Sequence, residues 1–465
     1  MPVEALPGHA ALRLPWAARL TPACATKVAT ASGAVERSQT GVTGAFDMGG
    51  RAKARCDLLG VPPYSEVDGQ LTRRFLSPAH DAALDTLSLW ITEAGMTVRR
   101  DAAGNLIGRY EGASPDAPAL LIGSHIDSVR NGGRYDGPLG ILLGVDLIEA
   151  LHDAGRRLPF ALEVIAFGDE EGSRFAASMS CSRAVAGTLD PAAVLGMIDA
   201  EGVTLAQAFT AFGLDPARIT EAARKPSDVI AFLEAHIEQG PVLEAEGLAL
   251  GVVTAIAAQK RLMVRISGMA GHAGTTPMPL RKDPGPAAAE CILALERICR
   301  AGTDNLVGTV GRMTALPGAF NVIPGAVEFS MDIRAETSAT RDAAVEAITT
   351  EIHTIAARRG LTATVTLMQA LDESPCDPDL TALLESAVGD LGLPVRRLPS
   401  GAGHDAMVMA DLCPTAMLFI RCEGGISHNP AESVTEADCA LAAQAMLAFV
   451  ERLADRDPRP STGSG

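Results

Sequence analysis

The feature that most constrains the fold is an alternation of short apolar runs with helical patterns. An apolar run at 119–122 leads directly into the string GSHIDSV, a helical pattern follows over 138–154, and a second apolar run spans 160–167. Strands that alternate with helices in this way are typical of a largely parallel sheet covered by helices on both faces. The sequence therefore predicts an α/β domain.

Further elements come from the same periodicity arguments. Helices are predicted over 84–94 and 382–392, and strands over 105–110 and 415–420. The chain has 465 residues, which is more than one domain usually holds. Two domains are therefore expected.

A different rhythm begins near Val252. The predicted order is a strand over 252–268, a helix over 284–301, strands over 306–316 and 326–335, a helix over 340–359 and a strand over 362–368. The order βαββαβ suits a small ferredoxin-like sandwich inserted into the larger domain. The predicted divisions are a flexible N-terminal extension over 1–45, a discontinuous catalytic domain over 46–251 and 369–455, a lid domain over 252–368, and a disordered tail over 456–465.

Composition excludes several classes of function. The formal net charge is -17 and no basic run stands out, so a nucleic-acid partner is not expected. No apolar run approaches the ~18 residues that a membrane helix needs, so no membrane partner is expected either. The nine cysteines are an odd number and form no CxxC pair, which favours reduced thiols and a cytoplasmic protein.

Polar side chains cluster where apolar strands end or glycines gather. The candidates are His125 and Asp127 in GSHIDSV, Asp136 in NGGRYDGPLG, Glu170 and Glu171 in FGDEEGSRF, His236 in EAHIEQG, and His428 in GGISHNPAE. Ligand sites of open α/β sheets form beyond the carboxyl ends of the strands, where these segments are expected.

The residue types suit a metal centre, because imidazole and carboxylate are good ligands for zinc or manganese. Three histidines and two acids can hold two ions if one carboxylate bridges them. Asp127 lies two residues after His125 and could orient its ring. Of two adjacent glutamates, one can bind metal while the other takes a proton from the bound water.

Structural explanations compete with these assignments. A single histidine is more often structural than a ligand, and His80, His152 and His353 keep that interpretation because each lies on or near an amphipathic helix. An Asp-Glu-Glu run is usually a solvated surface, and GGRYDGPLG could be an ordinary loop. The coincidence of so many candidates with strand ends and glycine-rich strings favours a functional site.

The motifs resemble the di-zinc aminoacylase and carboxypeptidase superfamily, within it the N-carbamoyl-L-amino acid hydrolase and allantoate amidohydrolase branch. The resemblance runs from about residue 46 to 455 and rests on GSHIDSV, GGRYDG, FGDEEGSRF, EAHIEQGPVLE, AGHAGTTPM, FNVIPG, DIRAE, SGAGHDA and SHNPAE. It implies Glu170 as the general base. It also implies the metal ligands His125, Asp136, Glu171, His236 and His428, with Asp136 bridging.

The same resemblance suggests groups that recognise substrate. Arg334 in DIRAE offers a planar fork for a carboxylate, although a strand-edge salt bridge is the alternative. Asn321 in FNVIPG and His272 in AGHAG could donate to a developing oxyanion. The family comparison adds Gln239, Lys260 and Gly403 as substrate contacts. The role of His404, beside Gly403, stays open.

The expected activity is hydrolysis of N-carbamoyl-L-amino acids to the amino acid, ammonia and carbon dioxide. Allantoate amidohydrolysis is the alternative, and an aminoacylase or dipeptidase comes third. A non-catalytic protein on the same fold would have lost a ligand or Glu170, and neither is missing. The expected cofactors are two divalent ions, zinc first, with manganese, cobalt or nickel as alternatives. The expected partners are a small carboxylate-bearing ureido substrate and a second copy of the chain, in a homodimer with shared active sites.

Overall fold

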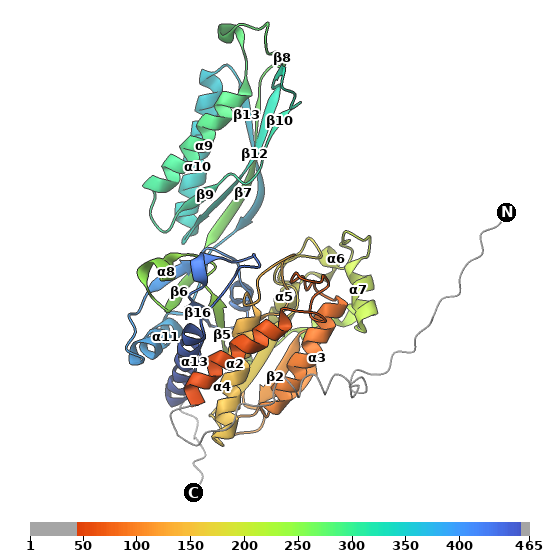
Figure 1. The fold of residues 1–465 in the computed structure, drawn as a ribbon, viewed down its shortest axis with the longest axis vertical. Coiled ribbons are helices and arrows are strands. Elements are labelled where there is room, and N and C mark those ends of the chain that lie inside the picture. The colour runs from red at the N-terminus through yellow and green to blue at the C-terminus, as the bar shows by residue number, and fades with distance from the viewer. Residues whose placement is uncertain (1–43, 457–465) are drawn as a thin grey trace, which may run out of the picture. The chain divides into compact units, whose positions relative to one another are not determined.

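The computed structural model of the protein describes residues 44–456, which form two sheets with their helices (Figure 1). The first sheet has nine strands in the order β1-β2-β4-β3-β5-β16-β6-β14, and β15 pairs with β6. Its strands are β1 (Thr97–Arg100), β2 (Leu106–Tyr110), β3 (Ala119–His125), β4 (Ala161–Phe167), β5 (Val229–Ile237), β6 (Leu250–Ile256), β14 (Ser374–Pro375), β15 (Arg397–Ser400) and β16 (Thr415–Ile420).

The centre of this sheet is parallel. Strand β3 pairs in parallel with β4 and β5, and β5 pairs in parallel with β16. The outer pairs β1–β2, β2–β4, β16–β6 and β14–β6 are antiparallel. The predicted α/β architecture with a mostly parallel central sheet is confirmed, and the carboxyl ends of four neighbouring strands meet at one edge.

Helices cover both faces of the first sheet. Side chains of β3 alternate between two cores, since Leu120 and Ile122 enter one core and Leu121 enters the other. The first core is completed by α2 (Gly44–Leu59), α3 (Pro78–Glu93), α4 (Pro138–Asp153), α11 (Pro378–Asp390) and α13 (Glu436–Arg456). The second contains residues of α5 (Ser180–Ala186), α6 (Pro191–Val194), α7 (Leu205–Phe212), α8 (Val242–Glu246) and α12 (Asp405–Met409). This double burial explains why the central strands read as continuous apolar runs.

The second sheet is antiparallel, in the order β10-β12-β7-β13 with β9 beside β12. Its strands are β7 (Ala258–Ser267), β9 (Val307–Thr309), β10 (Met313–Leu316), β12 (Ala326–Ala335) and β13 (Thr362–Leu371). Helices α9 (Pro284–Ala301) and α10 (Ser338–Arg358) contact each other and pack on the sheet (Figure 1). We call residues 258–371 the antiparallel subdomain.

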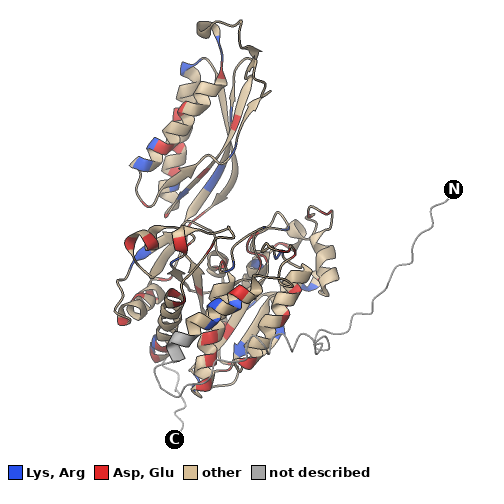
Figure 2. Ribbon diagram, viewed as in Figure 1, with Lys and Arg blue, Asp and Glu red and all other residues tan. Residues whose placement is uncertain are grey.

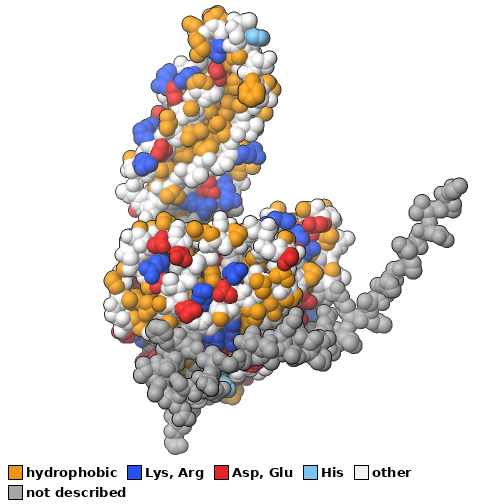
Figure 3. All heavy atoms as spheres, viewed as in Figure 1, with side chains coloured by type: hydrophobic (Ala, Val, Ile, Leu, Met, Phe, Trp, Pro, Cys, Tyr) orange, Lys and Arg blue, Asp and Glu red, His pale blue; other side chains and the backbone are white. Residues whose placement is uncertain are grey.

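One face of the second sheet forms a core and the other does not. Alternate residues of β7 and β12, such as Val264 and Phe329, pack under the two helices. The intervening residues of the same strands, which include Arg261, Asp332 and Arg334, lie on the opposite face. A separate two-stranded ribbon joins β8 (Gly271–His272) to β11 (Val322–Ile323). Hydrophobic side chains gather on the face of this subdomain that Figure 3 displays.

Two predicted strands were too long. The strand predicted over 252–268 is in fact β6 and β7, which belong to different sheets and are separated at Ala257. The apolar sequence pattern continues across Ala257, so the pattern does not reveal that the chain passes from one sheet to the other there. The strand predicted over 306–316 is in fact β9 and β10, which both pair with β12. Between them the Arg312 backbone N–H donates to the Ser330 hydroxyl.

Some elements of the fold had no predicted counterpart, and the predicted domain limits are not tested by the structure. Among the elements that were not predicted are α2, β5 and α13. The predicted domain limits stay predictions, and those for residues 1–43 and 457–465 lie outside the described residues.

Lysine and arginine are interspersed with aspartate and glutamate along the ribbon (Figure 2). Between residues 44 and 456, none of the helices combines the length and the apolar character that crossing a membrane requires.

Candidate metal centre

Each of the four central parallel strands delivers a candidate side chain to the same edge of the sheet. His125 is the last residue of β3, and His236 is the last but one of β5. Glu170 and Glu171 follow β4, and His428 follows β16. Because carboxyl ends of neighbouring parallel strands lie side by side, residues more than 300 positions apart in sequence come together.

Asp136 lies at the centre of this group. Its Oδ1 atom is 3.2 Å from Nε2 of His125 and 3.2 Å from Nε2 of His236. Its Oδ2 atom is 3.4 Å from Nε2 of His428, which in turn lies 3.5 Å from a carboxylate oxygen of Glu171. One carboxylate therefore faces three imidazoles.

The ligand atoms fall into two triads that share this carboxylate. One triad is His125, Asp136 and His236, and the other is Asp136, Glu171 and His428. Within each triad the candidate atoms lie within 4.8 Å of one another. The first triad is buried, whereas His428 leaves the second open to solvent on one side.

The chemistry of these side chains fits divalent cations. The Nε2 atom of His236 is buried, and its 3.2 Å approach to Oδ1 of Asp136 lacks hydrogen-bond geometry. Burial acts to raise the pKa of Asp136, but its contacts with His125, His236 and His428 outweigh burial and hold that pKa well below its usual range. A carboxylate with three imidazole nitrogens directed at it is the kind of donor set that zinc or manganese takes.

The pKa values of His428, Glu171 and Glu170 are also shifted by their charged neighbours and by burial. Contact with Asp136 raises the pKa of His428 to about 9, and burial together with the charge of Asp136 raises the pKa of Glu171 to about 7. Burial, the charge of Glu171 and that of Asp405 raise the pKa of Glu170 well above its usual range, against the opposing effect of His125. Positive charge placed among these groups would relieve their mutual repulsion.

Asp127 organises the neighbouring backbone. Its Oδ1 accepts the backbone N–H of Glu170 at 3.1 Å, and its Oδ2 accepts that of Glu171 at 3.2 Å. The same carboxylate lies 3.4 Å from Nδ1 of His125. Asp127 is fully buried, so these contacts orient one imidazole and both glutamates from beneath.

Special backbone conformations support this arrangement. Gly137, at the start of α4, has φ of +85°, and a Cβ there would lie 2.4 Å from the carbonyl oxygen of His125. Gln239 and His428 also occupy the left-handed region, at φ of 57° and 55°. Strain of this kind in residues with side chains is concentrated at functional sites. Gln239, predicted to contact substrate, donates to Oδ2 of Asp136 at 2.7 Å.

Three residues at the site were not assigned roles from the sequence. Ser427 donates to Oδ2 of Asp136 at 2.6 Å, and Glu432 accepts the backbone N–H of Asp136 at 3.1 Å. Ser427 and Glu432 are the first and last residues of the SHNPAE string, so their nearness to His428 in sequence was the available signal. Buried Glu234 accepts from Ser124 and from the backbone of Ala406, and its signal was its place two residues before His236 on one strand face.

His404, whose role was left open, packs behind a candidate ligand. Its ring centroid lies 4.5 Å from that of His236, and its Nε2 is 2.7 Å from the Ser400 hydroxyl. Glu234, His236 and His404 form another possible ligand group, but both oxygens of Glu234 already accept hydrogen bonds. This group therefore supports the ring of His236.

The remaining candidates lie on the antiparallel subdomain or near it. His272 and Asn321 are exposed on the β8–β11 ribbon and next to it, and Lys260 forms an ion pair with Asp342 at 2.7 Å. Arg334 donates to both oxygens of Asp332, so the salt bridge considered as its alternative role is present. Gly403 is exposed beside His404, where a Cβ would lie 2.9 Å from the terminal methyl of Met179.

Residues 121–452, which include every candidate metal ligand, match the sequence model of peptidase family M20/M25/M40. The match spans more than half of the chain. The chain belongs to peptidase family M20/M25/M40. The M20 family is one of metal-dependent hydrolases, which agrees with the two triads, and the predicted resemblance is confirmed.

Individual proteins are similar to this chain over most of their length. An N-carbamoyl-L-amino acid amidohydrolase of Geobacillus stearothermophilus is 46% identical, over 83% of this chain and 94% of that protein. An allantoate deiminase 1 of Glycine max is 39% identical, over 87% and 89%. A crystal structure of a hydantoinase/carbamoylase family amidase from Burkholderia multivorans has a TM-score of 0.80 and 34% identity, over 87% of this chain and 97% of that one.

Proposed function

We propose that this protein is a two-metal amidohydrolase that cleaves the ureido carbon–nitrogen bond of N-carbamoyl-L-amino acids. The products are the amino acid, ammonia and carbon dioxide. The observation that carries the proposal is the pair of ligand triads that share Asp136. Similarity to an N-carbamoyl-L-amino acid amidohydrolase at 46% identity supports this substrate class.

The two triads define which residues would hold the ions. His125 and His236 would bind one ion and Glu171 and His428 the other, with Asp136 bridging. Zinc is the first choice, and manganese, cobalt and nickel suit the same nitrogen and oxygen donors. Divalent ions at such a site lower the pKa of water and polarise a carbonyl oxygen.

Glu170 is the proposed general base. Burial makes its carboxylate more basic than an exposed one, and Asp127 fixes its backbone beside the ligands. The carboxylate would take a proton from the attacking water as the water oxygen bonds to the ureido carbon. It would then pass that proton to the amino-acid nitrogen as the carbon–nitrogen bond breaks. The released carbamate decomposes to ammonia and carbon dioxide.

His272 has the tautomer that an oxyanion donor needs. Its Nδ1 accepts the backbone N–H groups of Gly274 at 3.0 Å and Thr275 at 3.2 Å. A neutral imidazole that accepts at Nδ1 carries its proton on Nε2, so the exposed nitrogen is a donor. One such donor typically contributes ~3 kcal/mol to transition-state stabilisation, and Asn321 would supply a second.

Arg334 is the proposed partner of the substrate carboxylate, because its guanidinium can bind two carboxylate oxygens at once. Gln239, Lys260 and Gly403 would complete the contacts with the substrate. Anchoring the substrate carboxylate would hold the ureido carbonyl near Glu170, and this fixed geometry would lower the entropic part of the activation barrier.

Allantoate is the second candidate substrate. It is a ureido compound with a carboxylate, so the groups assigned above would serve it equally well. Allantoate deiminases of plants are 39% to 41% identical to this chain, which keeps this alternative in view.

We also propose a cytoplasmic homodimer whose subunits pair through the lid, the predicted domain 252–368. Large hydrophobic side chains are exposed on this part of the chain, and Phe320, beside Asn321, has 110% of its reference exposure. Exposed apolar surface of this extent is typical of an interaction site. The eight cysteines of the described residues are free, and all but Cys299 are buried, which suits a reducing compartment.

Metal removal provides the first test of the proposed function. Protein treated with a chelator and then desalted should release no ammonia from an N-carbamoyl-L-amino acid. Adding zinc or manganese should restore release, with two ions bound per chain at saturation. Undiminished ammonia release by verified metal-free protein would exclude the proposal, and one ion at full activity would exclude the bridging role of Asp136.

A further inference from the structure

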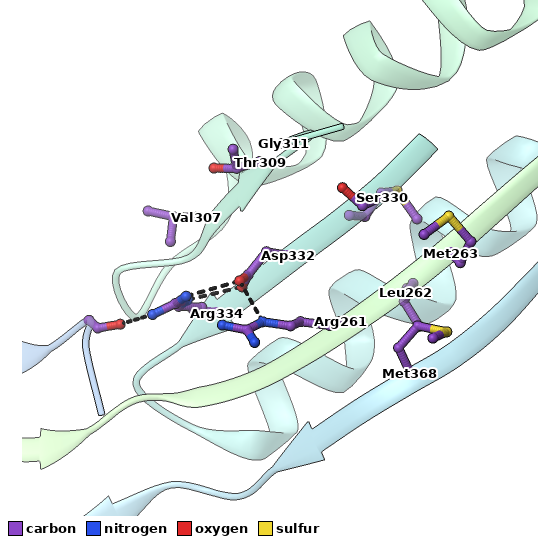
Figure 4. Close-up of a pocket in the computed structure, with 12 residues that line it drawn as sticks. Arg261, Leu262, Met263, Val307, Thr309, Gly311, Ser330, Asp332, Arg334 and Met368 are labelled. Atoms are coloured by element: carbon purple, nitrogen blue, oxygen red, sulfur yellow. Dashed lines mark hydrogen bonds and ion pairs between the residues drawn. The ribbon is translucent and has the colours of Figure 1, made fainter. Parts of the chain in front are cut away.

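Three side chains converge on Asp332, on the face of the second sheet that carries no helix. In the antiparallel pairing of β12 with β7, Asp332 lies opposite Arg261 and Arg334 lies opposite Gln259. Gln259 donates to both oxygens of Asp332, at 3.1 and 2.9 Å. Nε of Arg261 donates to Oδ2 of Asp332 at 3.2 Å (Figure 4). The register of the two strands therefore builds this cluster.

The third partner of Asp332 is Arg334. Its Nε donates to Oδ1 at 2.9 Å and its Nη2 donates to Oδ2 at 2.9 Å, so one edge of the planar guanidinium is fully engaged (Figure 4). The other edge keeps Nη1 and the second N–H of Nη2. Nη1 donates to the backbone carbonyl of Gly401 at 2.6 Å, a single neutral acceptor.

The surroundings leave this second edge able to receive an anion. Arg334, Asp332 and Gly401 line a cavity of about 660 Å³, which Met263 and Met368 also line (Figure 4). None of the candidate metal ligands lines this cavity. Two guanidiniums share one carboxylate, so the cluster keeps a positive charge after Asp332 is counted.

We propose that Asp332 is a positioning residue for Arg334, which it holds so that only the Nη1–Nη2 edge of the guanidinium faces the substrate carboxylate. This role rests on the proposed function, because it requires a carboxylate-bearing substrate. Gln259 and Arg261 in turn fix Asp332 through both of its oxygens. A fork held in advance loses less conformational freedom on binding, so the expected effect falls on KM for the acid.

A purely structural role for Asp332 gives a different expectation. If the cluster only joined β7 to β12, its loss would lower stability and affect all substrates alike. The same two strands offer a matched control, because Glu328 lies opposite Arg265 and forms an ion pair with it. Glu328→Gln removes a cross-strand ion pair without touching Arg334.

The test compares an N-carbamoyl-L-amino acid with its carboxamide, which lacks the anionic carboxylate. kcat and KM would be measured for the metal-loaded wild type, Asp332→Asn, Arg334→Lys, the double variant and Glu328→Gln. Asp332→Asn should raise KM for the acid about tenfold with little change in kcat, because a charged hydrogen bond is lost. Its preference for the acid over the amide should fall by a similar factor.

Arg334→Lys should weaken the acid more strongly, because an ammonium cannot reproduce the bidentate fork. Adding Asp332→Asn to Arg334→Lys should change KM little further, since no fork remains to be positioned. Glu328→Gln should match the wild type with both substrates. If Asp332→Asn does not fold, Gln259→Leu keeps the carboxylate, removes one of its donors, and should raise KM for the acid about two- to threefold.

The outcomes separate this proposal from the proposed function. An unchanged acid-to-amide preference in folded Asp332→Asn, with an active wild type, would overturn the positioning role and leave the function intact. So would additive effects of the two substitutions in the double variant. A wild type that turns over neither substrate would overturn both proposals.

Discussion

Glu170→Gln should abolish turnover while leaving the metal content near normal. The substitution keeps the shape of the side chain but removes a carboxylate that can accept a proton, and general-base catalysis typically contributes about 10²- to 10⁴-fold to the rate. Glu170 belongs to neither of the two triads that share Asp136, although with His125 and Glu171 it forms another possible ligand group. The metal content of Glu170→Gln therefore separates the proposed role as a base from a role as a ligand.

The adjacent Glu171 supplies the matched comparison. It is a member of the triad with Asp136 and His428, so Glu171→Gln should lose metal as well as activity. The two substitutions are chemically identical and one residue apart, and Asp127 accepts the backbone N–H of both positions. Measuring the metal content and kcat of both variants tests whether Glu170 acts as the base and Glu171 as a metal ligand. Equal metal content and equal activity in the two variants would show that the assigned division of labour is wrong.

Mixing two inactive variants should restore activity if the active sites are shared. His272 lies on the ribbon at the exposed surface of the predicted lid, whereas Glu170 lies at the edge of the parallel sheet. In the proposed two-fold dimer, His272 of one subunit serves the site of the other. Chains with Glu170→Gln and chains with His272→Ala would each be inactive alone.

The recovered activity has a predictable size. After dissociation and reassembly, random pairing makes about half of the dimers mixed, and one site in each mixed dimer receives both intact residues. About a quarter of wild-type activity should therefore return. If His272 serves its own subunit, no site in the mixture is complete. Verified subunit exchange without recovered ammonia release would contradict the shared-site arrangement.

Much of the candidate centre could be predicted because its signals are local. Each candidate ligand follows an apolar strand or lies in a glycine-rich string, and parallel strands bring such positions together. His125 was proposed from the strand that it ends, and Asp136 from the glycine-rich string around it. The strand β5, which carries His236, was not predicted, but its histidine was found through the string EAHIEQG.

The contacts that support the centre could not be predicted in the same way. Glu432 accepts the backbone N–H of Tyr135, 297 positions away, and no local pattern records that pairing. Arg334 was predicted as a carboxylate fork, but its contact with Asp332, and the contact of Asp332 with Gln259, depend on the register between two strands. The change of sheet at Ala257 was missed because an alternating strand pattern does not say which sheet a strand joins.

The central claim is that this chain hydrolyses the ureido bond of N-carbamoyl-L-amino acids. The most direct measurement is ammonia release from a panel of N-carbamoyl-L-amino acids, allantoate, ureidoglycolate and simple dipeptides, with manganese or zinc supplied. The highest kcat/KM is expected for an N-carbamoyl-L-amino acid, with one ammonia released per amino acid formed. A higher kcat/KM for allantoate would identify the alternative substrate, and cleavage of dipeptides without ammonia release from any ureido compound would contradict the claim.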